Sequence, residues 1–184
     1  ASYLKAAGQD VRVYFMGSKV DTVQPDYSPA LLDDLVARLR EVDLIGVSLM
    51  TSNFHRARFL TEHIRSAGVT APIVWGGTHP TVAPAESLAV ADAVCVGEGE
   101  EALLQLAERM ENGGDVTGVA SLWFRGGGAF GNRADVRNPL GPLMTDLDAL
   151  PFPDYELDTH WTADGDALQP ATPANLRGAL DTLR

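Results

Sequence analysis

Small and polar residues gather in three short segments, each directly after an apolar run, where they could contact a ligand. The segments cover residues 48–51, 76–80 and 97–99. Hydroxyl groups can donate and accept hydrogen bonds, and paired glycines let a large, flat ligand approach the backbone because no Cβ stands in the way. We therefore predict a binding site. Its candidate residues are Ser48, Leu49, Met50, Thr51, Gly76, Gly77, Thr78, His79, Pro80, Gly97, Glu98 and Gly99.

Acid–base and nucleophilic chemistry find little support in the residue pattern. Ser48, His79 and Asp92 could be drawn as a triad, but no G-x-S-x-G elbow accompanies the serine. The acidic residues of segment 98–101 stand where a predicted helix begins, and helix capping and solvation account for them. The Gly-x-Gly of residues 97–99 lacks the third glycine or the lysine of a phosphate-binding loop. We predict no catalytic residue in this chain.

Metal and redox chemistry are equally restricted. The single cysteine, Cys95, excludes an internal disulfide and an iron–sulfur cluster held by this chain alone. It lies within an apolar run, which should raise the pKa of its thiol and make it inert. No H-x-x-x-H or C-x-x-C pair is present for zinc, and we expect neither His55 nor His79 to be a metal ligand.

The elements that would position the three segments alternate between strand and helix. Residues 44–48 and 73–75 are short apolar runs typical of buried parallel strands, and residues 51–67 between them carry apolar residues at helical spacing. Thr51 and Ser52 are expected to cap that helix. We predict a doubly wound, flavodoxin-like α/β domain, with its ligand at the carboxyl ends of the strands. Strands are predicted near 11–15, 43–48, 72–75 and 93–96, and helices near 29–40, 51–67, 84–89 and 99–112.

The two ends of the chain suggest how the domain is bounded. Residues 2–8 resemble the last turns of a helix with a glycine C-cap, and a doubly wound sheet should place a central strand before it. We expect a fragment that lacks this strand, the alternative being a degenerate domain that begins with a helix. The predicted parts are an α/β domain over 1–115, a β-hairpin over 116–138 and a linker over 139–184, with residues 162–173 polar and mobile.

Composition excludes some partners and leaves one alternative class open. The net charge of −11 argues against a nucleic-acid surface, and the absence of a signal peptide or long apolar span predicts a cytoplasmic protein with no membrane contact. A flavodoxin-like interaction domain without a cofactor would also fit. A receiver domain would need a phosphorylatable aspartate at a strand end, where this chain has Ser48, Gly76 and Gly97.

Several of these motifs resemble a known family. Ser48-Leu49-Met50 resembles the S-x-L motif of cobalamin-binding domains, and Gly76-Gly77 follows at that family's spacing. The segments VSLMTSNFHRA, IVWGGTHPTVAPAE and VCVGEGEEALLQL resemble the amino-terminal domain of cobalamin-dependent radical SAM enzymes more closely. A fourth segment, LDALPFPDY, resembles the connection to the radical SAM barrel.

The resemblance implies a function and roles for several residues. Ser48 would hydrogen-bond the nucleotide base of cobalamin, Gly76 and Gly77 would form the floor beneath it, and His79 would lie near the corrin rim. The parent enzyme would add a 4Fe–4S cluster and S-adenosylmethionine, neither bound by this chain alone, and would methylate an unreactive carbon or phosphorus centre. Radical SAM cyclisation is the alternative within the family.

The cobalt ligand of methionine synthase-like proteins is the histidine of a D-x-H-x-x-G motif. None of Asp10, Asp21 and Asp26 is followed by histidine at the second position. The resemblance therefore implies base-off binding without a histidine ligand from residues 1–184.

Overall fold

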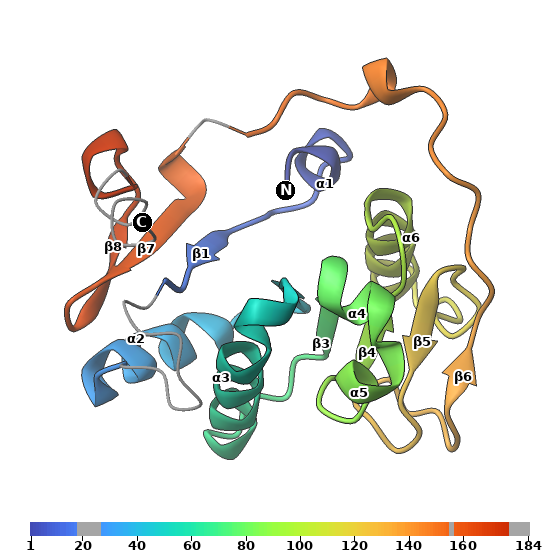
Figure 1. Cartoon of the computed structure of the whole chain (residues 1–184), viewed down its shortest axis with the longest axis horizontal. Helices are drawn as coiled ribbons and strands as arrows, with labels where there is room; N and C mark the ends of the chain where they lie inside the picture. The colour runs from blue at the N-terminus through green and yellow to red at the C-terminus, as the bar shows by residue number, and fades with distance from the viewer. Residues whose placement is uncertain (18–26, 155–156, 177–184) are drawn as a thin grey trace.

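The protein contains two sheets that share a hydrophobic core. A computed structural model describes residues 1–17, 27–154 and 157–176. The larger sheet has the order β2-β3-β4-β5-β6, with β2–β4 parallel and β5 and β6 antiparallel (Figure 1). Its strands are β2 (Ile45–Ser48), β3 (Ile73–Gly76), β4 (Ala93–Cys95), β5 (Leu122–Phe124) and β6 (Val136–Arg137). The smaller sheet has the order β1-β7-β8.

Helices precede, connect and follow the parallel strands β2, β3 and β4. The longer ones are α2 (Pro29–Leu39), α3 (Phe54–Ser66) and α6 (Glu100–Glu111), and the shorter ones are α1 (Ser2–Ala6), α4 (Thr78–Val82) and α5 (Pro84–Leu88). Of these, α3 connects β2 to β3, and α4 and α5 connect β3 to β4. Ser28 caps α2 by accepting a hydrogen bond from the Leu31 N–H, and Pro29 occupies the first turn, where its missing N–H costs nothing. Thr51 and Ser52 do not cap α3: they belong to a 3₁₀ turn, η1 (Thr51–Asn53), that precedes it.

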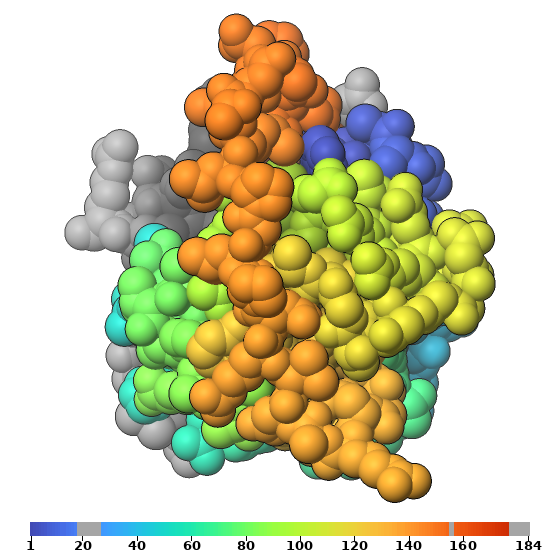
Figure 2. Space-filling view, turned by 90° about the vertical axis from the view of Figure 1, so that its right-hand side faces the viewer, coloured from blue at the N-terminus to red at the C-terminus, as the bar shows by residue number. Residues whose placement is uncertain are grey.

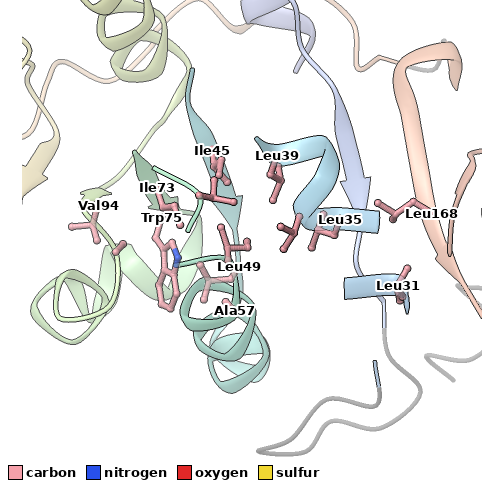
Figure 3. Packing of buried hydrophobic residues seen from close by; sticks show 14 of the residues in the cluster. Leu31, Leu35, Leu39, Ile45, Leu49, Ala57, Ile73, Trp75, Val94 and Leu168 are labelled. Carbon is pink, nitrogen blue, oxygen red and sulfur yellow. The ribbon is translucent and has the colours of Figure 1, made fainter. Parts of the chain in front are cut away.

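The core lies on both faces of β3. Ile73 and Trp75 pack with α2 and α3 on one face, whereas Val74 packs with α6 and β5 on the other, as the alternation of side chains along a strand requires. Trp75 is fully buried, and its indole N–H donates to the Thr61 hydroxyl at 3.1 Å. Figure 3 shows Trp75 beside Leu49 and Ala57. Burial on both faces confirms the predicted doubly wound class.

The strand β1 (Val13–Phe15) differs from the expected arrangement. It pairs in parallel with β7 (His160–Asp164), and no pairing with β2 is present among the described residues. The N–H groups of Ile45, which begins β2, and of Leu49, which follows it, donate to Pro72 O and Gly76 O on the β3 side. The N–H groups of the alternate residues therefore face the opposite edge. Gly46 on that edge is exposed. The expected additional strand stays a prediction, and this edge is where it would pair.

The region predicted as a linker, residues 139–184, contains a second hairpin. β7 turns at Gly165 into β8 (Ala167–Pro170), and the two strands pair antiparallel. Leu168 of β8 packs beside Leu35 of α2 (Figure 3), and its N–H donates to Asp34 at 2.9 Å. Residues 162–173, expected to be polar and mobile, thus include paired strands in which Ala163 and Leu168 reach the core. The role of 139–184 as a linker stays a prediction.

Residues 138–154 form an extended strap between the two hairpins, drawn in orange in Figure 1. Figure 2 shows the strap crossing the face of the molecule over the yellow-green residues. Gly141 N–H donates to the Ser121 hydroxyl at 2.9 Å, which fixes the strap to the start of β5. Among the described residues, no helix is long and apolar enough to cross a membrane.

Candidate functional site

The carboxyl ends of β2, β3 and β4 are followed by the three predicted segments, which we call the carboxyl edge. Ser48 and Gly76 are partners in the parallel register of β2 and β3. Beyond them, Leu49 N–H donates to Gly76 O at 3.0 Å, and His79 N–H donates to Leu49 O at 3.3 Å. The first two segments therefore lie against each other, as the sequence predicted for neighbouring parallel strands.

Gly77 is required by the protein's own packing. Its φ is +96°, and a Cβ there would lie 2.8 Å from Leu49 O and 3.3 Å from Ser48 Oγ. Gly76 differs, because its Cβ would meet only the Cβ of Cys95 at an ordinary 3.7 Å. The neighbouring backbone thus accounts for a glycine at position 77 without any ligand, and a larger side chain there would strain the fold.

The candidate residues divide into exposed and buried groups. Leu49 and His79 are each 4% exposed and belong to the interior, as does Pro80. Gly76 and Gly99 are half-buried. The residues that face solvent at the carboxyl edge are Ser48, Met50, Thr51, Gly77, Thr78, Gly97 and Glu98. Direct contact with a ligand stays a prediction, and the exposed group is the one placed to make it.

The His79 side chain is buried beneath the carboxyl edge. Its Nδ1 lies 3.3 Å from the Thr51 hydroxyl, and its ring packs on Phe54 with centroids 4.8 Å apart. Its Nε2 lies 3.7 Å from the Glu86 carboxylate, which is beyond hydrogen-bonding distance. The imidazole therefore joins α4 to the turn after β2.

Thr81 was missed by the sequence reasoning, although it connects two of the three segments. Its hydroxyl donates to Gly77 O at 2.9 Å and accepts from the Gly97 N–H at 3.0 Å. The available signal was a hydroxyl four residues after Gly77, at the spacing that lets a threonine bond back along a helix.

The β4 segment is held from its other side by the strap. The Glu98 carboxylate accepts a hydrogen bond from the Met144 N–H at 2.8 Å, so this acid serves the strap. Cys95 is 2% exposed, and its thiol donates to Glu98 O at 3.5 Å. Burial, and secondarily the charge of Glu100, raises the pKa of the Cys95 thiol to about 11, in agreement with the predicted inert cysteine.

An Asp-x-His pair near the carboxyl terminus was also missed. Asp158 and His160 have the motif's spacing, although Ala163 stands where the glycine would be. His160 is 4% exposed at the amino end of β7 and stacks on Phe15. Its Nε2 faces Asp154 at 3.9 Å. This imidazole is therefore buried in the smaller sheet, where it contacts Phe15, Thr159 and Asp154.

A cavity of about 500 Å³ lies beside α3 and α5. Its wall includes Phe54 and Glu86, which lie next to the buried His79. Four other charged side chains of the wall are in ion pairs: Arg58 with Glu62, and Arg65 and Arg125 with Asp92. Among the described residues, no group of three or more His, Cys, Asp or Glu side chains could hold a metal ion.

The parallel sheet, with small residues exposed at its carboxyl edge, defines a Rossmann-like ligand-binding domain. The family model of the B12 binding domain matches residues 1–107 of the 184. This range covers more than half of the chain and includes all three segments of the carboxyl edge. The chain therefore belongs to the B12-binding domain family.

Individual relatives are more distant. An uncharacterized methyltransferase of Pyrococcus horikoshii is 27% identical over 118 residues, which cover 62% of this chain and 25% of that protein. The cobalamin-dependent S-adenosylmethionine radical enzyme OxsB, solved with aqua-cobalamin and S-adenosylmethionine bound, is 15% identical, with a TM-score of 0.54 over 84% of this chain and 25% of that chain. The radical S-adenosylmethionine methyltransferase TsrM from Kitasatospora setae, solved with cobalamin and a 4Fe–4S cluster bound, is 21% identical, with a TM-score of 0.47 over 71% of this chain and 31% of that chain. The likeness to OxsB shows a shared fold, and this chain spans about a quarter of the length of the curated relative it matches.

Proposed function

We propose that the carboxyl edge of β2, β3 and β4 binds cobalamin. Membership of the B12-binding family carries this proposal, because the matched range contains all three segments. The surface agrees with a large, flat ligand: backbone and small side chains are exposed at Ser48, Gly77 and Gly97, so little side-chain bulk blocks a close approach.

The edge also offers apolar contacts for such a ligand. Met50, which follows β2, is 60% exposed, and Val82, which ends α4, is 69% exposed. Large apolar side chains exposed beside a cradle of small residues are typical of a ligand-binding surface. We assign the nucleotide end of cobalamin to the cradle between Ser48 and Gly97, and the corrin ring to the apolar side chains.

The chain's own residues would bind and orient the cofactor. The Ser48 hydroxyl is exposed and can accept or donate a hydrogen bond to the base, and Thr78 offers a second hydroxyl beside it. Cobalamin would supply the methyl-carrying cobalt centre. We assign no acid–base step to this chain, since the acid Glu98 is engaged by the strap.

We further propose that this domain serves a radical SAM methyltransferase, as the amino-terminal module of a longer protein. The 4Fe–4S cluster and S-adenosylmethionine would be held by a domain of the same protein beyond this chain, whose one cysteine is buried. Production of S-adenosylhomocysteine by the full-length protein is the expected result. Formation of 5′-deoxyadenosine alone would instead favour the cyclase alternative.

Titration of the chain with hydroxocobalamin, followed by the visible spectrum and by equilibrium dialysis, tests the binding proposal. We expect one bound cobalamin per chain. Ser48→Leu should weaken binding strongly, because the added bulk projects from an exposed position into the cradle, whereas Thr70→Val, at an exposed residue before β3, should bind as the parent does. Failure of the parent chain to bind would favour the cofactor-free interaction domain.

A further inference from the structure

The short helix α4 stands between the segments that follow β2 and β4 and is bonded to both. Toward β2, the His79 N–H donates to Leu49 O, and the His79 imidazole meets the Thr51 hydroxyl at 3.3 Å. The imidazole also packs against the Phe54 ring, and the two ring centroids are 4.8 Å apart. The β2 side of α4 is therefore fixed by backbone, side-chain and aromatic contacts together.

Toward β4, the connection depends on one hydroxyl. Thr81 Oγ1 donates to Gly77 O at 2.9 Å and accepts from the Gly97 N–H at 3.0 Å. The donor and one acceptor site of this hydroxyl are thus both used, although Thr81 itself is exposed. No other side-chain hydrogen bond between α4 and the segment 97–99 is found among the described residues.

The backbone at Gly97 needs a contact from another element to stay in one conformation. Its φ is +89°, in a region that glycine enters and leaves easily, and its residue is exposed. Because the hydrogen bond from its N–H ends on Thr81, the position of this segment relative to Gly77 follows the position of α4.

We propose that Thr81 and His79 are positioning residues that set the separation of the three segments at the carboxyl edge. α4 acts as a strut: His79 fixes its place against the β2 segment, and Thr81 transmits that place to the β4 segment. Resting on the proposed cobalamin function, this makes Thr81 a determinant of affinity that need not touch the cofactor. Thr81 would raise the affinity for cobalamin because the cradle between Ser48 and Gly97 is already formed before the cofactor binds.

Two measurements on the same variants test the strut and its link to binding separately. Amide hydrogen exchange at Gly97, followed by NMR without cofactor, reports the Thr81 hydrogen bond directly. The dissociation constant for hydroxocobalamin reports how well the cradle between Ser48 and Gly97 binds the cofactor. Thr81→Val removes the hydroxyl at nearly constant shape, Thr81→Ser restores it, and Thr70→Val controls for replacing an exposed threonine.

In Thr81→Val we expect Gly97 exchange to be faster and cobalamin binding to be weaker, each by about five- to tenfold, as for the loss of one hydrogen bond. Thr81→Ser should recover most of both, and Thr70→Val should match the parent. Melting curves establish that each variant is folded, and Thr81→Ala, which also lacks the hydroxyl and suits a helix, takes the place of an unfolded valine variant.

The two readouts separate the possible failures. Unchanged Gly97 exchange in the valine variant would overturn the strut itself. Faster exchange with unchanged affinity would overturn its role in positioning. A parent chain that binds no cobalamin would refute the proposed function and with it the positioning role, whereas the exchange result would still decide whether Thr81 holds Gly97.

Discussion

The Asp92 carboxylate accepts a hydrogen bond from the backbone N–H of Ile73 at 2.9 Å, which joins the amino ends of β3 and β4. The same carboxylate is bonded to Arg125 at 2.9 Å and to Arg65, and Asp92 is only 3% exposed. A buried carboxylate is tolerated when its oxygens are fully engaged in this way. The Asp92 cluster therefore holds the sheet at the edge opposite to the candidate site.

Asp92→Ala should lower the free energy of unfolding by about 2–4 kcal/mol, because the Ile73 N–H loses its acceptor and two guanidinium groups lose their counter-charge. Chemical denaturation followed by circular dichroism measures this. The matched control is Glu62→Gln, which breaks the exposed Arg58–Glu62 pair and should cost no more than about 0.5 kcal/mol. Equal effects of the two substitutions would contradict the role of Asp92.

Gly77 and Gly76 offer a matched pair of adjacent glycines. Gly77→Ala should destabilise the cofactor-free protein by about 2 kcal/mol or more, because φ is +96° and the new Cβ would overlap Leu49 O. Gly76→Ala should change stability by less than about 1 kcal/mol, since its Cβ meets only an ordinary contact. Thermal melting distinguishes them, and equal melting temperatures for the two variants would show that the Gly77 contact is unimportant.

The raised thiol pKa of Cys95 predicts a loss of stability at alkaline pH. A cysteine ionises near pH 9 when unfolded, and at about 11 here, so the folded state holds the proton over the interval between them. Stability should therefore fall from about pH 9 to pH 11, by about 2–3 kcal/mol in total. The pH dependence of urea unfolding measures this loss, and the part due to Cys95 should vanish in Cys95→Ala. An unchanged alkaline slope in that variant would assign the loss to other groups.

Among the described residues no strand pairs with the outer edge of β2, and this edge allows a test of the proposed additional strand. The N–H groups of Gly46 and Ser48 alternate with those that donate to β3, so they should exchange rapidly with solvent in this chain. In a protein extended at its amino terminus, both should become protected. Slow exchange of both amides in residues 1–184 alone would show that the edge is already covered.

Most of the larger sheet could be predicted because each parallel strand carries a continuous apolar run. A continuous apolar run predicts a strand that is buried on both faces, and Ile73 to Trp75 are buried in this way. The hairpin of β7 and β8 could not be predicted in this way. β7 alternates residues such as Trp161 and Thr162, and its pairing with β1, far away in the sequence, leaves no local signal.

In the candidate site, too, the features set by local sequence could be predicted, whereas those set by contacts between distant segments could not. The small residues at the strand ends were predictable from their types and spacing. The burial of His79 was not, because it depends on Phe54 and Thr51 arriving from the preceding helix and turn. The need for glycine at position 77 could not be predicted from the sequence either. The atom that a Cβ would overlap, Leu49 O, belongs to the loop of the neighbouring strand.

The last prediction concerns the axial ligand of cobalt in the proposed complex. Two of the histidines considered for this role are buried: His79 is engaged with Thr51 and Phe54, and His160 is enclosed at the amino end of β7. His55 is exposed in the first turn of α3, where no hydrogen bond from a described residue fixes its tautomer. Ligation by an imidazole needs a ring that can reach the metal and a partner that fixes its tautomer. We therefore predict base-off binding without a histidine ligand from this chain.

Electron paramagnetic resonance of the bound Co(II) form measures this directly. We expect no triplet superhyperfine splitting from an axial nitrogen, whereas free base-on cobalamin, the control, shows that triplet. A triplet in the protein complex would contradict the prediction. Its loss in one of the four single variants His55→Ala, His63→Ala, His79→Ala and His160→Ala would then identify the ligand, and its persistence in all four would point to the cofactor's own base. Because the substitutions at His79 and His160 remove buried rings, melting curves must first show that these variants are folded at the temperature of cofactor loading.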